Sequence, residues 1–185
     1  MAKSPFETLP PFDKEKKLWR VVVETPCGTG AKYKYEPEFG LFTLSTSLPE
    51  GMNFPLDFGF LPGTLGDDGD PLDVLLLNDQ PTFCGCVVPA RLIGVIEAEQ
   101  TSREGETERN DRLVAVADRS RRYGDHESLK DLGKQWVDDL ENFFITFNRS
   151  KGGKFKILDT REAKDAEGAA REGMKNAKKK VKRKK

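Results

Sequence analysis

Short apolar runs separated by turn residues dominate the first two thirds of the chain. The runs are rich in Val, Leu, Ile and aromatic residues, which is typical of strands, and clusters of Gly, Pro and Asp stand between them. They predict strands at residues 18–25, 32–35, 41–45, 73–77, 87–97 and 113–117. This spacing favours a mainly β fold built around a closed or nearly closed barrel.

The pattern changes after Asp125, where apolar residues recur at intervals of three and four. Such spacing places them on one face of a helix, formed by Leu129, Leu132, Trp136, Val137, Leu140, Phe143, Phe144 and Phe147. A second helix is predicted to begin near Asp159 and Thr160, which can cap it, and to continue through a series of alanines. The fold class is therefore α+β, with helices in the C-terminal third.

Length and composition fit one globular domain, since the 185 residues are 36% hydrophobic and 34% charged. We divide the chain into an N-terminal arm (1–17), a barrel with its first helix (18–158), and a C-terminal helix with a basic tail (159–185). The chain has no run of 18 apolar residues and no apolar stretch near its start, so we expect a cytoplasmic protein without membrane association. The cysteines, Cys27, Cys84 and Cys86, are expected to be reduced thiols.

Charge is unevenly distributed, although the formal net charge is zero. From Lys175 to the end there are eight Lys and Arg residues and no acid, which leaves 23 basic against 31 acidic residues in the rest. An acidic body argues against nucleic acid as the main partner and suits a protein that binds divalent cations. The tail reads as a solvated helix end, although a polybasic segment can also hold RNA or an acidic partner.

Four carboxylates lie within seven residues, at Asp67, Asp68, Asp70 and Asp73. Their mutual repulsion at neutral pH is costly unless a cation lies among them. Asp68 and Asp70 project to the same side of an extended chain, and Pro71 favours that extended conformation at Asp70. Ligand sets made only of oxygen suit Mg²⁺, which takes further oxygens from water and phosphates.

Three other interpretations of this cluster compete with a Mg²⁺ site. A solvated acidic turn is the usual meaning of such a segment when it stands alone. An EF-hand loop counted from Asp68 needs Gly at its sixth position and Glu at its twelfth, where this chain has Asp73 and Asp79. A phosphatase with an aspartyl nucleophile needs its apolar strand before the acids, whereas here DVLLL follows them.

The segment GDDGDPLDVLLL resembles the motif of the soluble, Mg²⁺-dependent family I inorganic pyrophosphatases. The segments VVVETP, MNFPLDFGFLPGTL, LIGVIE, RLVAVA, YGDHESLKDL and FFITFN support the resemblance, because they follow in the family's order. It covers residues 18–158. It implies an OB-like five-stranded β-barrel with flanking C-terminal helices, assembled into homo-oligomers that bind pyrophosphate and phosphate.

The resemblance also implies roles for particular residues. Asp68 and Asp73 would bind the metal, and Asp70 would bind it and accept a proton from the attacking water. Glu24 would act on metal-bound water, and Lys32 would hold phosphate. Mg²⁺, for which Mn²⁺ or Zn²⁺ can substitute, would neutralise pyrophosphate and make water nucleophilic.

Several positions depart from the family. Asn110 stands where a metal-binding acid is expected, and Arg112 stands where a phosphate-binding lysine is expected. The lysine expected after FFITF is also replaced, and Arg149, Lys151 and Lys154 are near enough in sequence to compensate. We assign metal binding to Asn110 and phosphate binding to Arg112 and Lys154.

Two functions from different classes follow. The first is hydrolysis of pyrophosphate to two orthophosphates by metal-activated water. The second is a catalytically impaired relative that binds a metal, a phosphate compound or a protein. The second rests on Asn110, on the loss of an Arg in LSTSLP, on Lys34 in place of Glu, and on three Tyr-to-Phe changes, at Phe54, Phe58 and Phe147. A weaker third idea, single-stranded nucleic-acid binding, needs a positive groove lined by aromatic residues.

Overall fold

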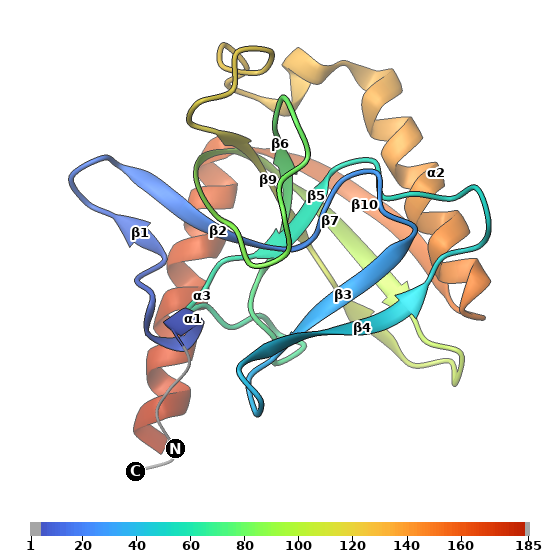
Figure 1. Cartoon of the computed structure of the whole chain (residues 1–185), viewed down its shortest axis with the longest axis horizontal. Coiled ribbons are helices and arrows are strands. Elements are labelled where there is room, and N and C mark those ends of the chain that lie inside the picture. The colour runs from blue at the N-terminus through green and yellow to red at the C-terminus, as the bar shows by residue number, and fades with distance from the viewer. Residues whose placement is uncertain (1–4, 184–185) are drawn as a thin grey trace.

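The computed structural model describes residues 5–183, in which ten strands and three α-helices are present (Figure 1). Residues 1–4 of the predicted arm and the last two lysines of the basic tail lie outside this range. In chain order the elements are α1 (Pro5–Thr8), β1 (Phe12–Asp13), β2 (Leu18–Thr25), β3 (Ala31–Glu36), β4 (Leu41–Ser47), β5 (Asp57–Phe60), β6 (Asp73–Leu77), β7 (Val87–Thr101), β8 (Thr107–Arg109), β9 (Arg112–Ala117), a 3₁₀ helix (Leu129–Leu132), α2 (Lys134–Ser150), β10 (Lys154–Glu162) and α3 (Ala163–Arg183).

Five strands form a closed ring. The hydrogen-bonded order is β2–β5–β6–β9–β7, and β7 pairs back with β2. Neighbouring strands are antiparallel except β6 and β9, which run parallel. This confirms the prediction of an OB-like five-stranded barrel. Outside the ring, β1 adds to β2, while β8 and β10 add to the long strand β7.

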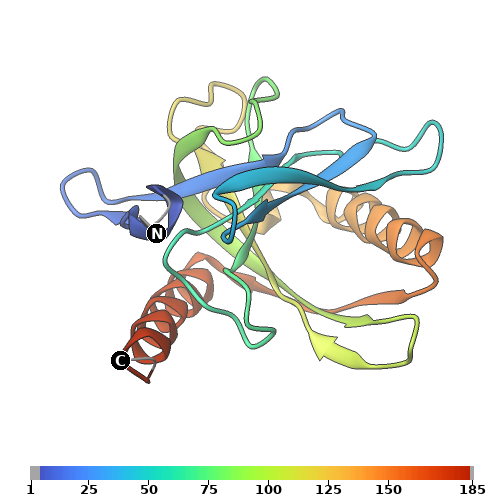
Figure 2. The ribbon, with the colours of Figure 1, turned by 60° about the horizontal axis from the view of Figure 1, so that its bottom comes forward.

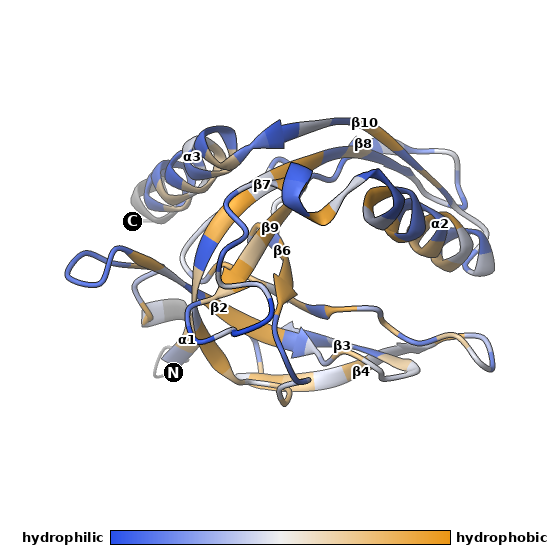
Figure 3. Ribbon diagram, turned by 90° about the horizontal axis from the view of Figure 1, so that it is seen from above, coloured by the Kyte–Doolittle hydropathy of each residue, from blue (hydrophilic) through white to orange (hydrophobic). Residues whose placement is uncertain are grey.

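The barrel strands are buried on both faces. In β6, Val74 and Leu76 enter a core that α3 closes with its alanines, whereas Leu75 and Leu77 enter a second core that α2 closes with its phenylalanines. Figure 3 shows these strands as hydrophobic segments between the two helices. Burial on both faces explains why DVLLL reads as a continuous apolar run rather than an alternating one.

The helix predicted from Leu129 onward is present in two pieces. A 3₁₀ turn covers Leu129–Leu132, and α2 begins only at Lys134. Gly133 separates them with φ of +79°, a left-handed conformation that an α-helix does not accommodate. The apolar periodicity is therefore real, but the glycine interrupts the helix.

The predicted start of the second helix near Asp159 and Thr160 is wrong. Residues 154–162 form β10, which pairs with β7 from Lys154 opposite Thr101 to Glu162 opposite Gly94. The helix α3 follows at Ala163. The edge of β7 offers backbone hydrogen bonds along this whole length, and that tertiary pairing overrides the local capping signal.

The hairpin β3–β4 and strand β10 lie on opposite sides of the barrel (Figures 2 and 3). The loop of residues 61–72 joins β5 to β6 and lies beside α3. No helix within residues 5–183 is long and apolar enough to cross a membrane. The three cysteines are free thiols.

Candidate active site

A cavity of about 510 Å³ opens between the β3–β4 hairpin, the loop before β6 and the segment around β8. It brings together six residues that the sequence predicts for the site: Glu24, Lys32, Asp68, Asp70, Asp73 and Asn110. The other lining residues are Lys34, Tyr35, Glu36, Pro37, Phe58, Phe60, Pro71, Gln100 and Glu108. Carboxylates and ammonium groups thus share one hollow.

The carboxylate loop, residues 65–71, is shaped by its own backbone. The Gly66 amide donates to the Asp70 carbonyl at 2.8 Å, and the Asp70 amide donates to Asp68 Oδ1 at 3.0 Å. Asp73 differs because it opens β6 and pairs with Phe60 and Arg112 on the neighbouring strands. Burial raises the pKa of Asp73, and the nearby Asp68 and Asp70 raise it further, while Arg112 and Lys32 oppose them.

Glu24 lies near the end of β2 and is 8% exposed. Its Oε1 accepts a hydrogen bond from the Tyr35 amide at 2.7 Å, which fixes the carboxyl group against β3. Burial raises the pKa of Glu24 to about 7, although this hydrogen bond and the ammonium groups of Lys32 and Lys34 favour the charged form. A carboxyl group with that pKa can exchange a proton near neutral pH.

Lys34 forms an ion pair with Asp70, with 3.1 Å between Nζ and Oδ2. The sequence predicted no role for Lys34, although its spacing of two residues from Lys32 on a strand puts both side chains on one face. Strand periodicity is therefore the signal that reveals it. The pair is half exposed at the cavity, so its energetic weight is modest.

The ammonium groups of two lysines, Lys32 and Lys151, lie against aromatic rings. Lys32 Nζ lies 5.1 Å from the centre of the Phe58 ring and 6.0 Å from that of Phe147. Lys151 Nζ lies 4.2 Å from the centre of the same Phe147 ring. Burial lowers the pKa of Lys151 to about 8, and the like charges of Lys32 and Arg112 lower it further. Cations gathered against each other in this way suit a multiply charged anion.

Arg112 and Lys154, both predicted to hold substrate, are absent from the cavity lining among the described residues. Arg112 is only 4% exposed, and its guanidinium lies 4.3 Å and 4.7 Å from the centres of the Phe144 and Phe155 rings. Its Nη1 donates to the Asn110 carbonyl at 2.9 Å. Lys154 is exposed at the start of β10. Their substrate-binding roles stay predictions, and Lys151 lies closer to the other cations.

Comparison with known proteins agrees with this geometry. The family model described as inorganic pyrophosphatase matches residues 21–178. The chain belongs to the inorganic pyrophosphatase family. This confirms the resemblance that the carboxylate motif predicted.

Individual relatives of this family member cover most of its length. It is 36% identical over 157 residues to an inorganic pyrophosphatase of Halalkalibacterium halodurans, covering 85% of this chain and 91% of the relative. Identity to the inorganic pyrophosphatase of Synechocystis is 33% over 161 residues, with 87% and 92% covered. The crystal structure of the inorganic pyrophosphatase from Thermus thermophilus matches with a TM-score of 0.84 at 30% identity, over 95% of this chain and 99% of that one.

The donor atoms in the cavity of this pyrophosphatase family member fit a hard divalent ion in kind. Asp68, Asp70, Asp73 and Asn110 line the same hollow, and each side chain has an oxygen that can bind a metal. Within residues 5–183, however, no three acidic, His or Cys side chains already stand at metal-binding distance of one another. Mg²⁺ keeps several waters and needs only one or two carboxylates together with substrate phosphates, so this open arrangement suits it.

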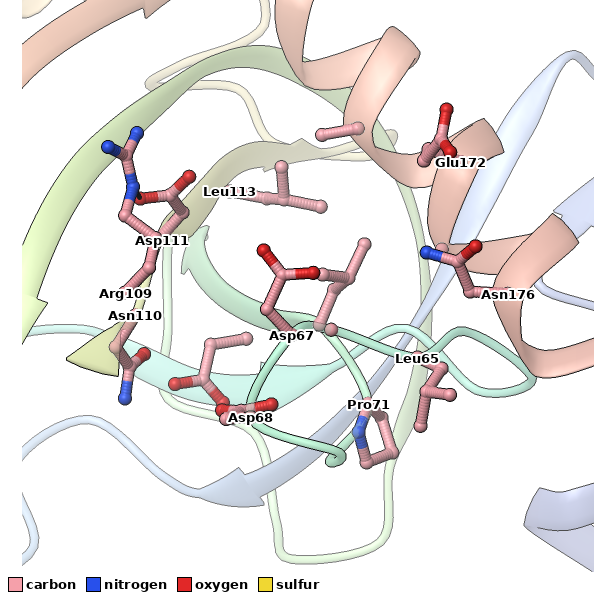
Figure 4. Close-up of a pocket in the computed structure, with 15 residues that line it drawn as sticks. Leu65, Asp67, Asp68, Pro71, Arg109, Asn110, Asp111, Leu113, Glu172 and Asn176 are labelled. Carbon is pink, nitrogen blue, oxygen red and sulfur yellow. Dashed lines mark hydrogen bonds and ion pairs between the residues drawn. The ribbon is translucent and has the colours of Figure 1, made fainter. Parts of the chain in front are cut away.

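A second hollow, of about 160 Å³, lies on the other side of the carboxylate loop (Figure 4). Its walls come from the loop, from the start of β9 and from α3, with Asp67, Asp111, Glu172 and Asn176 among the residues drawn. Four residues border both hollows, namely Asp68, Pro71, Asp73 and Asn110. The carboxylate loop therefore separates the two hollows in this pyrophosphatase fold.

Proposed function

We propose that this chain is an inorganic diphosphatase that hydrolyses pyrophosphate to two orthophosphates with Mg²⁺. Membership of the inorganic pyrophosphatase family supports the reaction and the class of enzyme. The observation that carries the proposal is the one cavity in which Asp68, Asp70, Asp73 and Glu24 line the same hollow as Lys32 and Lys34. A site with both signs of charge suits a metal ion bound together with a phosphate anion.

In this proposal the acidic and amide side chains bind the metal, and the basic side chains bind the phosphate groups. Asp68, Asp70, Asp73 and Asn110 would hold Mg²⁺, which supplies charge neutralisation and a more acidic water when bound. Lys32 would hold the phosphate groups, with Lys151 against the same Phe147 ring. Arg112 is buried, and its guanidinium fixes the Asn110 backbone by donating a hydrogen bond to the Asn110 carbonyl. Pyrophosphate would then span the boundary between the acidic and the basic part of the cavity.

Proton transfer falls to two carboxyl groups. Asp70 would take the proton of the attacking water, and its Oδ2 lies 3.1 Å from the ammonium of Lys34. Glu24 is buried beside them with a pKa of about 7, and would pass a proton to or from water at neutral pH. No covalent nucleophile is required.

The direct test is release of orthophosphate from pyrophosphate by the purified full chain. We expect release with Mg²⁺, its loss in excess EDTA, and its return when Mg²⁺ is restored in excess. Molybdate detection of orthophosphate over pH 6–9 measures it. If no release exceeds the EDTA control with Mg²⁺, Mn²⁺ or Zn²⁺, the proposal is wrong.

The impaired relative remains the second candidate, because two observations favour it. Lys34 already pairs with Asp70, and Asn110 offers a neutral amide where a carboxylate would bind a cation more strongly. A protein that binds Mg²⁺ or phosphate by calorimetry but releases no orthophosphate would support this second function.

Replacing Lys34 with glutamine is expected to tighten Mg²⁺ binding about tenfold, because an ammonium within a few ångströms of a divalent ion opposes its binding. Calorimetric titration of the substrate-free protein measures the Kd. Lys14→Gln is the matched control, since Lys14 is exposed in the β1–β2 turn (Figure 1) and loses the same charge. Equal Mg²⁺ affinities for the two variants would contradict the expectation.

We also propose that the protein works in the cytoplasm as a homo-oligomer and that Mn²⁺ or Zn²⁺ can replace Mg²⁺. We further propose a division into an arm (1–17), a barrel with its helix (18–158) and a C-terminal helix with a basic tail (159–185). The boundary at residue 158 falls inside β10. The acidic character of the body disfavours nucleic-acid contact except at the basic end of α3.

A further inference from the structure

The helix α3 contacts the carboxylate loop at two places two helical turns apart. The Leu65 amide donates to the Gly173 carbonyl at 3.0 Å, and Lys180 Nζ donates to the Gly69 carbonyl at 3.3 Å. Gly173 and Lys180 are seven residues apart, so both lie on the same face of the helix. One side of α3 therefore holds both the beginning and the tip of the loop.

The contact at Gly173 depends on the missing side chain. A Cβ there would lie 2.8 Å from Leu72 Cδ1 and 3.1 Å from Thr64 Cβ. Thr64 Oγ1 accepts a hydrogen bond from the Leu72 amide at 3.0 Å and donates one to the Leu61 carbonyl at 2.6 Å, which ties the two ends of the loop together. The helix thus rests directly on the base from which the loop projects.

The rest of the loop has little other support. Hollows lie on both of its sides, and the bonds from Gly66 to Asp70 and from Gly69 to Gly66 shape the loop without anchoring it. The ion pair between Lys34 and Asp70 reaches it from the opposite side, and both of those side chains are about half exposed. The position of Asp68 and Asp70 therefore depends on what α3 supplies.

We propose that α3 positions the metal-binding carboxylates, with Gly173 and Lys180 as its positioning residues. Gly173 sets the distance between the helix and the base of the loop, and Lys180 holds the loop tip through the Gly69 carbonyl. The link to metal binding rests on the proposed function, whereas the link to loop order rests on the contacts alone.

Lys180→Ala compared with Lys179→Ala tests the tip contact, since both lysines are exposed on α3 and both changes remove one positive charge. Loss of charge alone would tighten Mg²⁺ binding slightly. Loss of a positioning hydrogen bond weakens it, by about three- to tenfold in Kd. We expect weaker binding for Lys180→Ala only, with rescue by Lys180→Arg. Calorimetry with Mg²⁺ alone measures the Kd.

Gly173→Ala compared with Gly168→Ala tests the base contact. Gly168 lies in the same helix, and a Cβ there would meet nothing within 4 Å. Alanine favours a helix over glycine at either position, so a difference between the variants reports the contact with the loop. We expect Gly173→Ala to weaken Mg²⁺ binding and Gly168→Ala to leave it unchanged, with both variants keeping a cooperative thermal transition.

Hydrogen exchange of the loop amides, measured without metal, gives a readout independent of activity. Faster exchange in residues 66–70 of Lys180→Ala and Gly173→Ala, with Lys179→Ala and Gly168→Ala like wild type, supports the proposal. Equal exchange and equal Mg²⁺ affinity in each matched pair would overturn it. Absence of orthophosphate release by the wild type would instead refute the proposed function, since exchange still reports loop order.

Discussion

Replacing Asp70 with asparagine is expected to lower the rate of orthophosphate release about 100- to 10,000-fold, which is the range that a positioned general base contributes. Asparagine keeps the size of the side chain and loses the capacity to accept a proton. Asp70 lines the cavity and is paired with Lys34, so the change removes a charge at the proposed site of water attack. Steady-state rates at saturating Mg²⁺ and pyrophosphate measure the loss in kcat.

Asp67→Asn is the matched control for this experiment. Asp67 belongs to the same loop and is exposed, but it lines the smaller hollow and not the cavity that Asp70 lines. We expect its kcat to stay within about threefold of wild type, since an exposed charge away from the reacting atoms has a weak, screened influence. Comparable losses in both variants would show that the loop carries only general negative charge, and the role of Asp70 would be rejected.

Replacing Glu24 with glutamine is expected to stabilise the metal-free protein while reducing turnover. Burial raises the pKa of Glu24 from 4.5 to about 7, so the native state keeps a proton that the unfolded chain has lost. The free energy of unfolding therefore falls as pH rises through the window from about 4.5 to about 7. Glutamine does not titrate, and its amide oxygen can keep the hydrogen bond from the Tyr35 amide.

The expected gain for Glu24→Gln is about 3 kcal/mol in free energy of unfolding at pH 8, and close to zero at pH 4.5, from the shift in pKa. Urea unfolding in EDTA at the two pH values measures it, with Glu15→Gln as an exposed control. Orthophosphate release at pH 8 should fall in the same variant, as expected for a residue that trades stability for activity. An unchanged pH dependence of stability would contradict burial as the cause.

Several parts of the fold could be predicted because they depend on local composition. The predicted strands at 18–25 and 73–77 coincide with β2 and β6, and the strand at 113–117 with nearly all of β9. The runs at 74–77 and 113–117 are apolar throughout because both of their faces are buried, which makes them conspicuous in the sequence. Strand β5 escaped prediction because it is only four residues long and lies between irregular segments.

Strand β10 escaped prediction for a different reason. Its residues, KFKILDTRE, are mostly charged and exposed, and only Phe155 is buried. The segment is extended because the long strand β7 presents a free edge to it. Those backbone hydrogen bonds outweigh the local capping signal at Asp159 and Thr160, so the pairing decides. As a result, α3 begins at Ala163, after the predicted start near Asp159.

The sequence by itself determined four of the five barrel strands and the family, and it predicted the oxygen ligands, since each is written in contiguous residues. The tertiary structure alone decided which cations meet those ligands and what holds the loop. Lys34 and Asp70 are 36 residues apart, and Lys180 and Gly69 are 111 apart. It also buried Arg112 against two rings and left Lys154 exposed. Such contacts arise from closing the barrel and packing α3 against it, which no local pattern encodes.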